Sequence, residues 1–260
     1  MYKILKYSFF DLIRSKWNYV YFLFYFLITI SLLYLSGDVS KVVISLMNII
    51  LTLAPLIATI FGVMYYYNSR EFVELLLAQP IKRKNIFIGQ YLGLAISLTL
   101  SYLLGVGIPF AIYGIFASAS IWNFSILLVV GAFLTFIFTG IAFLVALYNE
   151  NKLRGFGLAI MVWLFLAVIY DGLFLLSLMA LNEYPLEKFS LIASIVNPID
   201  LSRILILLKL DISALMGYTG AVFRKFFGQN TGMMISMLVL IVWTIVPVYL
   251  INRKVKSKDF

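Results

Sequence analysis

Six long apolar segments restrict this chain to a membrane fold. They cover residues 17–36, 42–67, 86–118, 123–148, 156–181 and 233–251. A helix needs about 20 apolar residues to cross the hydrocarbon core of a bilayer, and each segment is close to or above that length. Because the hydrocarbon holds no water, the backbone must satisfy its own hydrogen bonds there, which favours helices. We predict an all-α membrane protein with six transmembrane helices in one domain, residues 1–260, and a tilt or a broken end in the third and fifth spans.

Lysine and arginine are distributed unequally between the two sides that six spans create. If both termini are cytoplasmic, the inner segments hold 14 of these residues and the outer segments hold 6. Cytoplasmic loops carry an excess of Lys and Arg, so this orientation is the predicted one. The net charge of +9 is then explained by topology, and we expect contact with the lipid bilayer and no binding to nucleic acid.

The chain contains neither cysteine nor histidine. Their absence removes disulfides, most zinc and copper sites and the commonest general base. The sequence also lacks the glycine-rich loop that holds nucleotide phosphates. We therefore expect no catalytic residues, no metal site and no cofactor on this chain, and any ATP must bind elsewhere. Met233, Met234 and Met237 offer thioether groups, but methionines at helical spacing more often pack.

Residues 1–16 have the pattern of an amphipathic helix, with apolar side chains on one half of the wheel and Lys3, Lys6 and Arg14 on the other. Such a helix lies in the membrane interface, packs on neighbouring spans, or does both. The third span carries glycines at positions 89 and 93, a spacing that lets two helices approach closely.

The inner loop at 68–85 joins the second and third spans and has the composition of a docking element. Charges of both signs flank a leucine run at 75–77, because Glu71 and Glu74 precede it and three basic residues at 82–84 follow it after Pro80. This pattern predicts a short helix that ends before a proline turn. The loop either inserts into a groove of a soluble partner or is an ordinary basic inner loop.

The outer segment at 182–232 is too charged for a seventh span. Asn197 and Pro198 form a good helix start, and Asp200 can pair with Arg203 three residues on. This helix is expected at the outer interface or dipping between spans, and the glycines after Met216 permit a bend. The segment is either an interfacial anchor or an external gate and docking surface.

Asp171 is the one acid inside a predicted span. Intramembrane ionisable groups are functional candidates by default. Asp171 either lines a cavity or is a hydrated residue near the end of its helix.

The inner loop resembles the coupling helix of type 2 ABC exporter permeases, in which this helix sits on the ATPase subunit. The resemblance implies the type 2 ABC exporter permease fold, and an ATPase partner that binds ATP and Mg. It departs at Gln90, where a basic residue often follows glycine. The residues to which it assigns ATPase coupling are Glu71, Glu74, Leu76, Pro80, Ile81 and Arg83.

The outer run from Asn197 to Gly228 is similar to the NosY permeases of the nitrous oxide reductase maturation system. That similarity implies a homodimer in the bacterial inner membrane, a NosF-like cytosolic ATPase and a NosD-like periplasmic β-helix protein. It also implies a role in assembling the copper–sulfur cluster of nitrous oxide reductase, by export of a sulfur species or by mechanical transmission. The residues to which it assigns a gate or partner-docking role are Asn197, Pro198, Asp200, Arg203, Met216, Gly217, Tyr218, Gly220 and Phe223.

Two alternatives remain at this point. The first is a type 2 ABC exporter for lipid, drug or peptide. The second is a secondary transporter or channel that works without ATP, against which stand the compact inner loop, the sparse intramembrane charge and the missing sequence repeat.

Overall fold

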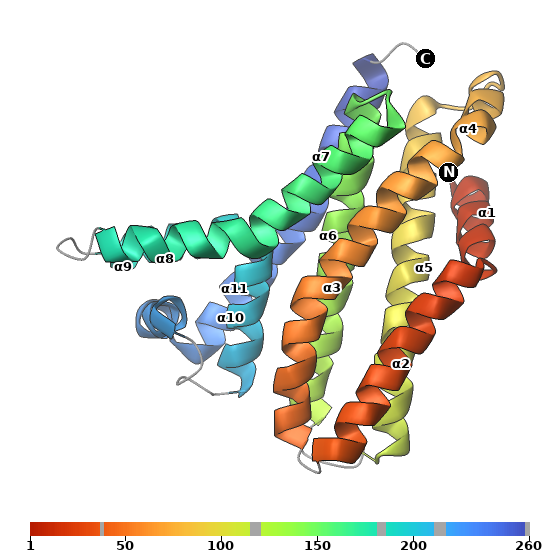
Figure 1. Ribbon diagram of the computed structural model, residues 1–260. Helices are drawn as coiled ribbons and strands as arrows, with labels where there is room; N and C mark the ends of the chain where they lie inside the picture. The colour runs from red at the N-terminus through yellow and green to blue at the C-terminus, as the bar shows by residue number, and fades with distance from the viewer. Residues whose placement is uncertain (37–38, 115–120, 181–185, 211–216, 258–260) are drawn as a thin grey trace.

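Helices form all the regular secondary structure in the residues that the computed structural model describes, which are 1–36, 39–114, 121–180, 186–210 and 217–257. The first half contains α1 (Tyr2–Ile13), α2 (Lys16–Ser36), α3 (Val39–Asn68), α4 (Arg70–Leu77), α5 (Arg83–Ile112) and α6 (Ile121–Tyr148). The second half contains α7 (Lys152–Leu164), the π-helix η2 (Phe165–Ile169), α8 (Tyr170–Ala180), α9 (Glu187–Val196), α10 (Pro198–Leu210) and α11 (Gly217–Ser257). Figure 1 shows their arrangement.

Six helical stretches are long and apolar enough to cross a membrane, which confirms the predicted number. They are Lys16–Ser36, Lys41–Asn68, Arg83–Ile112, Phe124–Tyr148, Lys152–Ala180 and Asn230–Ser257. The helix of the third span ends at Ile112, earlier than the end at 118 that the sequence pattern predicted.

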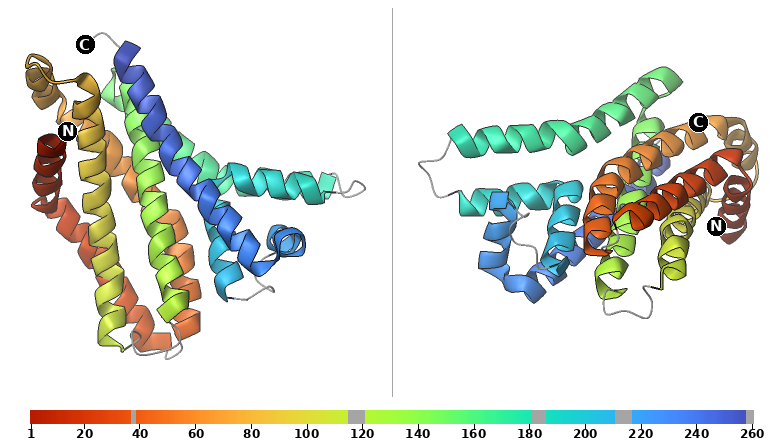
Figure 2. Two further views of the ribbon diagram at one scale, coloured as in Figure 1. Left: turned by 180° about the vertical axis from the view of Figure 1, so that it is seen from behind. Right: turned by 60° about the horizontal axis from the view of Figure 1, so that its bottom comes forward.

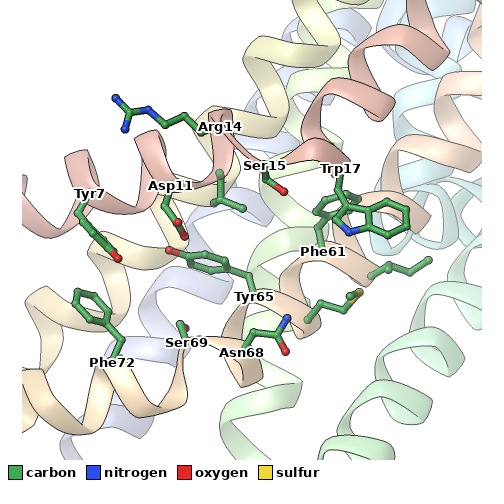
Figure 3. A pocket seen from close by; sticks show the side chains of 13 residues that line it. Tyr7, Asp11, Arg14, Ser15, Trp17, Phe61, Tyr65, Asn68, Ser69 and Phe72 are labelled. Atoms are coloured by element: carbon green, nitrogen blue, oxygen red, sulfur yellow. The ribbon is translucent and has the colours of Figure 1, made fainter.

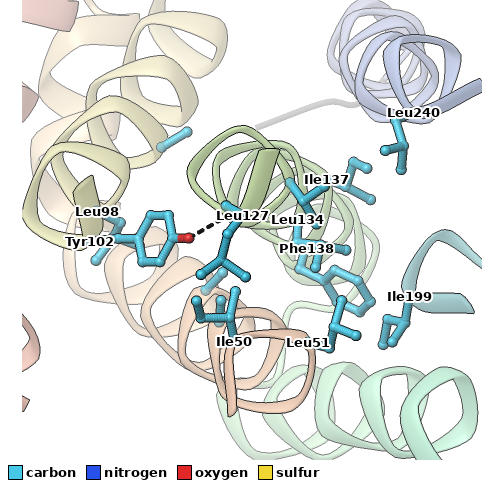
Figure 4. Close-up of a cluster of buried hydrophobic side chains, with 14 of the residues drawn as sticks. Ile50, Leu51, Leu98, Tyr102, Leu127, Leu134, Ile137, Phe138, Ile199 and Leu240 are labelled. Atoms are coloured by element: carbon cyan, nitrogen blue, oxygen red, sulfur yellow. Dashed lines mark hydrogen bonds between the residues drawn. The ribbon is translucent and has the colours of Figure 1, made fainter. Parts of the chain in front are cut away.

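Helix α6 is the centre of the bundle, because α3, α5, α7, α10 and α11 all pack against it. Its fully buried side chains include Leu134 and Phe138, which meet residues of α3, α10 and α11 (Figure 4). The Tyr102 hydroxyl donates to the Leu127 carbonyl at 2.8 Å, so the one polar atom of this large core side chain is satisfied between α5 and α6.

Helix α1 packs against α5 through the two glycines that the sequence analysis singled out. A Cβ atom on Gly93 would lie 2.6 Å from the Cβ of Ser8, and one on Gly89 would lie 3.1 Å from Cγ2 of Ile4. Neither position has room for a side chain, so the predicted close helix approach is confirmed. Its partner is the amphipathic helix, whose Ile4, Ser8 and Leu12 are buried.

One end of the bundle carries both termini, α4 and the connection between α6 and α7 (Figure 1). Most of the basic residues of the predicted inner segments lie in these parts of the chain. We call this end the basic end.

The fifth span leaves the bundle obliquely, and α8 projects sideways before α9 returns beside it (Figure 2). The π-helix interrupts this span near its middle, at Phe165–Ile169, whereas the sequence pattern predicted a tilt or a broken end. The following pair of helices, α9 and α10, is bent by 110° at the break between Val196 and Pro198. Helix α10 then packs against α11, α6 and α3. Of the two positions expected for this helix, the structure therefore shows the one between the spans and not the one on the outer interface.

Candidate functional site

Helix α4 is the short helix that the inner loop predicted, and it ends at Leu77, before Pro80. Glu71 and Glu74 are exposed. The Glu74 carboxylate forms an ion pair with Nε of Arg70 at 3.1 Å, and both side chains are open to solvent. Pro80 and Arg83 are exposed beyond the helix, whereas Leu76 and Ile81 are half-buried against the core. The exposed leucine is Leu75, at 69%. A helical wheel of α4 would have singled it out, because Val73 faces inward.

Two contacts attach α4 and the residue before it to the rest of the bundle. The Phe72 ring stacks on Tyr7 of α1, with ring centroids 4.7 Å apart. The Gln90 side chain of α5 donates to the hydroxyl of Ser69, which precedes α4, at 3.1 Å. A force applied to the exposed face of α4 therefore acts directly on α1 and α5.

The second inner connection, residues 149–151, is attached to the end of α3. The Tyr67 hydroxyl donates to the Asn149 carbonyl at 2.6 Å, and the Lys152 ammonium group donates to Asn68 at 3.0 Å. Asn151 caps α7 by accepting the N–H groups of Leu153 and Arg154. The start of the fifth span is thus held by the segment that leads into α4, which the sequence pattern did not indicate.

The break between α9 and α10 follows from the Asn197–Pro198 pair. A proline disfavours helical geometry in the residue before it, and Asn197 is extended at φ −103° and ψ 112°. Pro198 is the first residue of α10, where its missing N–H costs nothing. The Asn197 side-chain oxygen accepts the Ile199 N–H at 3.1 Å, so the predicted helix cap is confirmed.

Asn197 also connects this break to the π-helix of the fifth span. In η2 the Tyr170 N–H bonds to the Phe165 carbonyl, five residues back, instead of the Leu166 carbonyl. The Leu166 carbonyl accepts the Asn197 side-chain amide at 2.9 Å. The π-helix therefore frees a backbone acceptor for a residue 31 positions further along the chain.

Three charged side chains meet beside Asn197. One guanidinium nitrogen of Arg203 lies 3.1 Å from Asp171 of α8 and 3.1 Å from Asp200 of α10. Asp200 also accepts from the Asn197 amide at 3.0 Å. The expected Asp200–Arg203 pair is confirmed, and Asp171 joins it. With two carboxylates and one guanidinium, the cluster carries one excess negative charge when all groups are ionised.

Two aromatic side chains donate hydrogen bonds to carbonyl groups at the end of α9. Its last carbonyls have no partner within the helix. The Tyr170 hydroxyl donates to the Ala193 carbonyl at 2.8 Å, and the Trp243 indole N–H donates to the Ile195 carbonyl at 3.1 Å. These bonds attach α9 to α8 and α11, and no local motif in the sequence pointed to them.

The structure separates the nine residues expected at an outer gate or docking surface. Asn197 and Pro198 are buried in this conformation. Met216 lies outside the described residues. Gly217, Tyr218, Gly220 and Phe223 lie in the first turns of α11, where only the backbone is described. The bend in this helix is at Gly228, not at Gly217 or Gly220.

The three methionines of the last span do not all lie on one side of the helix. Met233 and Met237 are half-buried against the core, and Met234 is 67% exposed. Their positions fit packing and lipid contact better than a shared metal site.

Comparison with known proteins places the chain in a family. Residues 38–254 match the family described as ABC-2 family transporter protein. The protein named "Probable ABC transporter permease protein NosY" from Stutzerimonas stutzeri is 26% identical over 226 residues, which cover 81% of this chain and 78% of that protein. Both matches indicate a non-catalytic transmembrane subunit of an ABC transporter, which implies an ATPase partner and removes the alternative of an ATP-independent transporter or channel. The chain belongs to the ABC-2 family of transporter proteins, as a NosY-like permease that crosses the membrane several times.

Proposed function

We propose that this permease carries ATP-driven movement from a NosF-like cytosolic ATPase to the outer side of the bacterial inner membrane, where it serves assembly of the copper–sulfur cluster of nitrous oxide reductase. In this proposal two copies form a homodimer with cytoplasmic termini. ATP and Mg bind to the ATPase. A NosD-like periplasmic β-helix protein receives the movement, or a sulfur species is exported.

The observation that carries the proposal is a continuous line of contacts between the two candidate regions. Helix α4 follows directly on α3, whose Tyr67 bonds to Asn149. The adjoining α7 continues through η2, where the Leu166 carbonyl meets Asn197 at the start of the buried α10. Packed helices with defined hydrogen bonds transmit displacement, because a close-packed interior cannot deform continuously.

The position of α4 supports the ATPase half of this proposal. Its exposed residues Glu71, Glu74 and Leu75 lie at the basic end, while Val73 anchors the helix inside. An exposed apolar side chain next to two carboxylates suits insertion into a groove of a soluble protein.

The first test is co-purification of the tagged chain, in detergent, from cells that express its neighbouring genes. We expect a cytosolic ATPase and a periplasmic β-helix protein to be recovered together. Leu75→Asp should release the ATPase. The control Leu35→Asp should retain it, because Leu35 is also exposed, at 79% against 69% for Leu75, but lies near the C-terminal end of α2. Tyr218→Ala/Phe223→Ala should release the β-helix protein alone.

The second test asks whether the line of contacts serves cluster assembly. Asn197→Ala should retain both partners but lower the copper–sulfur content of nitrous oxide reductase in the same cells. A normal copper–sulfur cluster in a strain that lacks this chain would contradict the maturation role. Recovery of the ATPase without a β-helix protein would then indicate an exporter for lipid, drug or peptide.

A further inference from the structure

A cleft of about 810 Å³ opens at the basic end between α1, the start of α2, the end of α3 and α4. Figure 3 shows its walls, with Tyr7 and Phe72 at one end and Trp17 beside Phe61 at the other. A second cavity of about 500 Å³ adjoins it through Tyr7, Asp11 and Arg14. The volume of the main cleft is within the range of sites that bind small molecules, about 300–1,000 Å³.

The cleft is apolar toward the spans, at Trp17 and Phe61, and its polar side chains lie between this end and the Tyr7–Phe72 pair (Figure 3). Ile60, Phe61 and Met64 come from the second candidate span, and Trp17 is the second residue of the first span. Asp11, Arg14, Ser15, Asn68 and Ser69 form the polar part. This gradient matches a molecule with a polar head and an apolar chain. A soluble protein does not fit it, since the apolar half belongs to helices that lie in lipid.

The rim of the two cavities carries a surplus of positive charge. Lys3, Lys6 and Arg14 stand against the single carboxylate of Asp11. Among the described residues, none of the three cations is in an ion pair, and the guanidinium of Arg14 contacts only the Phe10 ring, 6.0 Å from its centroid. An anionic group at the rim would therefore gain attraction without displacing an internal partner.

We propose that this cleft binds one anionic phospholipid, with its phosphate at the rim near Arg14 and the upper part of an acyl chain against Trp17, Phe61 and Met64. Basic pockets between membrane helices suit anionic headgroups, and tryptophan is favoured at the depth where headgroups meet the hydrocarbon. Because Tyr7 and Phe72 line one end of the cleft and stack on each other, the bound lipid would support the contact between α1 and α4.

Native mass spectrometry of the full chain tests this proposal, using equal amounts of phosphatidylglycerol and phosphatidylcholine during release from detergent. We expect one retained phosphatidylglycerol molecule in preference to phosphatidylcholine. Arg14→Gln should lower that preference about fivefold, the effect of one cation near anionic lipid. The control Lys16→Gln removes the same charge two residues away, outside both cavities, and should leave the preference unchanged.

A second variant tests the apolar half of the cleft without changing charge. Met64→Trp fills the cleft at a position that is 38% exposed, and it should abolish the retained lipid while the rim cations remain. Equal retention of the two lipids by the original chain would overturn the proposal. So would an equal loss in Lys16→Gln and Arg14→Gln, which would indicate non-specific surface charge. Displacement of the lipid by the bound ATPase would assign the cleft to that partner instead.

Discussion

Asn197 is the side chain at which a helix start, a helix irregularity and a charged cluster meet. It caps α10 through Ile199, and its amide donates to the Leu166 carbonyl and to Asp200. All three groups are hydrogen-bonded to one side chain that has no exposed surface. A buried amide in this position leaves several groups unsatisfied when it is removed.

Asn197→Ala should lower the free energy of unfolding by about 2–4 kcal/mol. About 1 kcal/mol is the usual effect of a lost helix cap, and the buried Leu166 carbonyl left without a donor adds about 1–3 kcal/mol. Equilibrium unfolding in mixed micelles measures the change. Asn68→Ala, which removes an exposed amide at the basic end, is the control and should change stability by less than about 1 kcal/mol. Equal effects of the two variants would contradict the role assigned to Asn197.

We expect substitutions of the three charged residues to have unequal effects on the free energy of unfolding. Asp171→Asn leaves one carboxylate for Arg203 and should be close to neutral. Arg203→Gln leaves Asp171 and Asp200 facing each other and should cost about 2–3 kcal/mol, less than a fully buried pair because these side chains are partly exposed. The cost should shrink as the pH falls, since protonation of one carboxylate removes the repulsion. Thermal unfolding at several pH values gives the comparison, and a larger effect of Asp171→Asn would refute this account.

At the scale of helices, the contact between α1 and α5 depends on small residues. Gly93→Ala would place a Cβ atom 2.6 Å from that of Ser8, and moving α1 away should cost about 1–3 kcal/mol. Gly107→Ala lies in the same helix with no neighbour within 4 Å, so it should be neutral or stabilising by up to about 1 kcal/mol. Hydrogen exchange of the α1 amides should accelerate in the first variant alone. Unchanged exchange in Gly93→Ala would show that α1 is not held by this contact.

The bend in α11 depends on the backbone of Gly228. Its φ of 66° and ψ of −176° lie in a region that is essentially restricted to glycine. Gly228→Ala should cost about 1–3 kcal/mol through backbone strain alone, since the nearest atom to an added Cβ is 3.8 Å away. Gly172→Ala, at a helical glycine with open space, is the matched control in thermal unfolding. An equal, small effect in both variants would argue against a fixed bend.

At the scale of the whole molecule, the proposed orientation can be tested by thiol labelling, because the chain has no cysteine to give a background. Leu75→Cys lies at the basic end and Lys41→Cys at the start of the second span, and both positions are exposed. A membrane-impermeant maleimide should label Leu75→Cys only in inside-out vesicles and Lys41→Cys only in intact spheroplasts. The reverse pattern would place both termini outside and would contradict ATPase docking at α4.

The positions of the main elements were predictable from sequence because each rests on a local pattern. Apolar length located the six spans, the proline before the basic triplet located the end of α4, and the Asn197–Pro198 pair located the start of α10. The glycine spacing in α5 indicated a close helix approach, but it did not identify α1 as the partner.

Local sequence patterns are enough to indicate six membrane-spanning helices, a short charged helix between the second and third spans, and a charged helix that starts at Asn197–Pro198 before the last span. Hydrophobic length and proline stereochemistry act within a few residues, so they are visible without a fold. The position of α10 between the spans, the pair of Asp171 with Arg203 and the hydrogen bond from Asn197 to the Leu166 carbonyl of the π-helix are not visible in such patterns. The two contacts join residues 31 and 32 positions apart in the sequence, and contacts of this kind depend on how the helices pack.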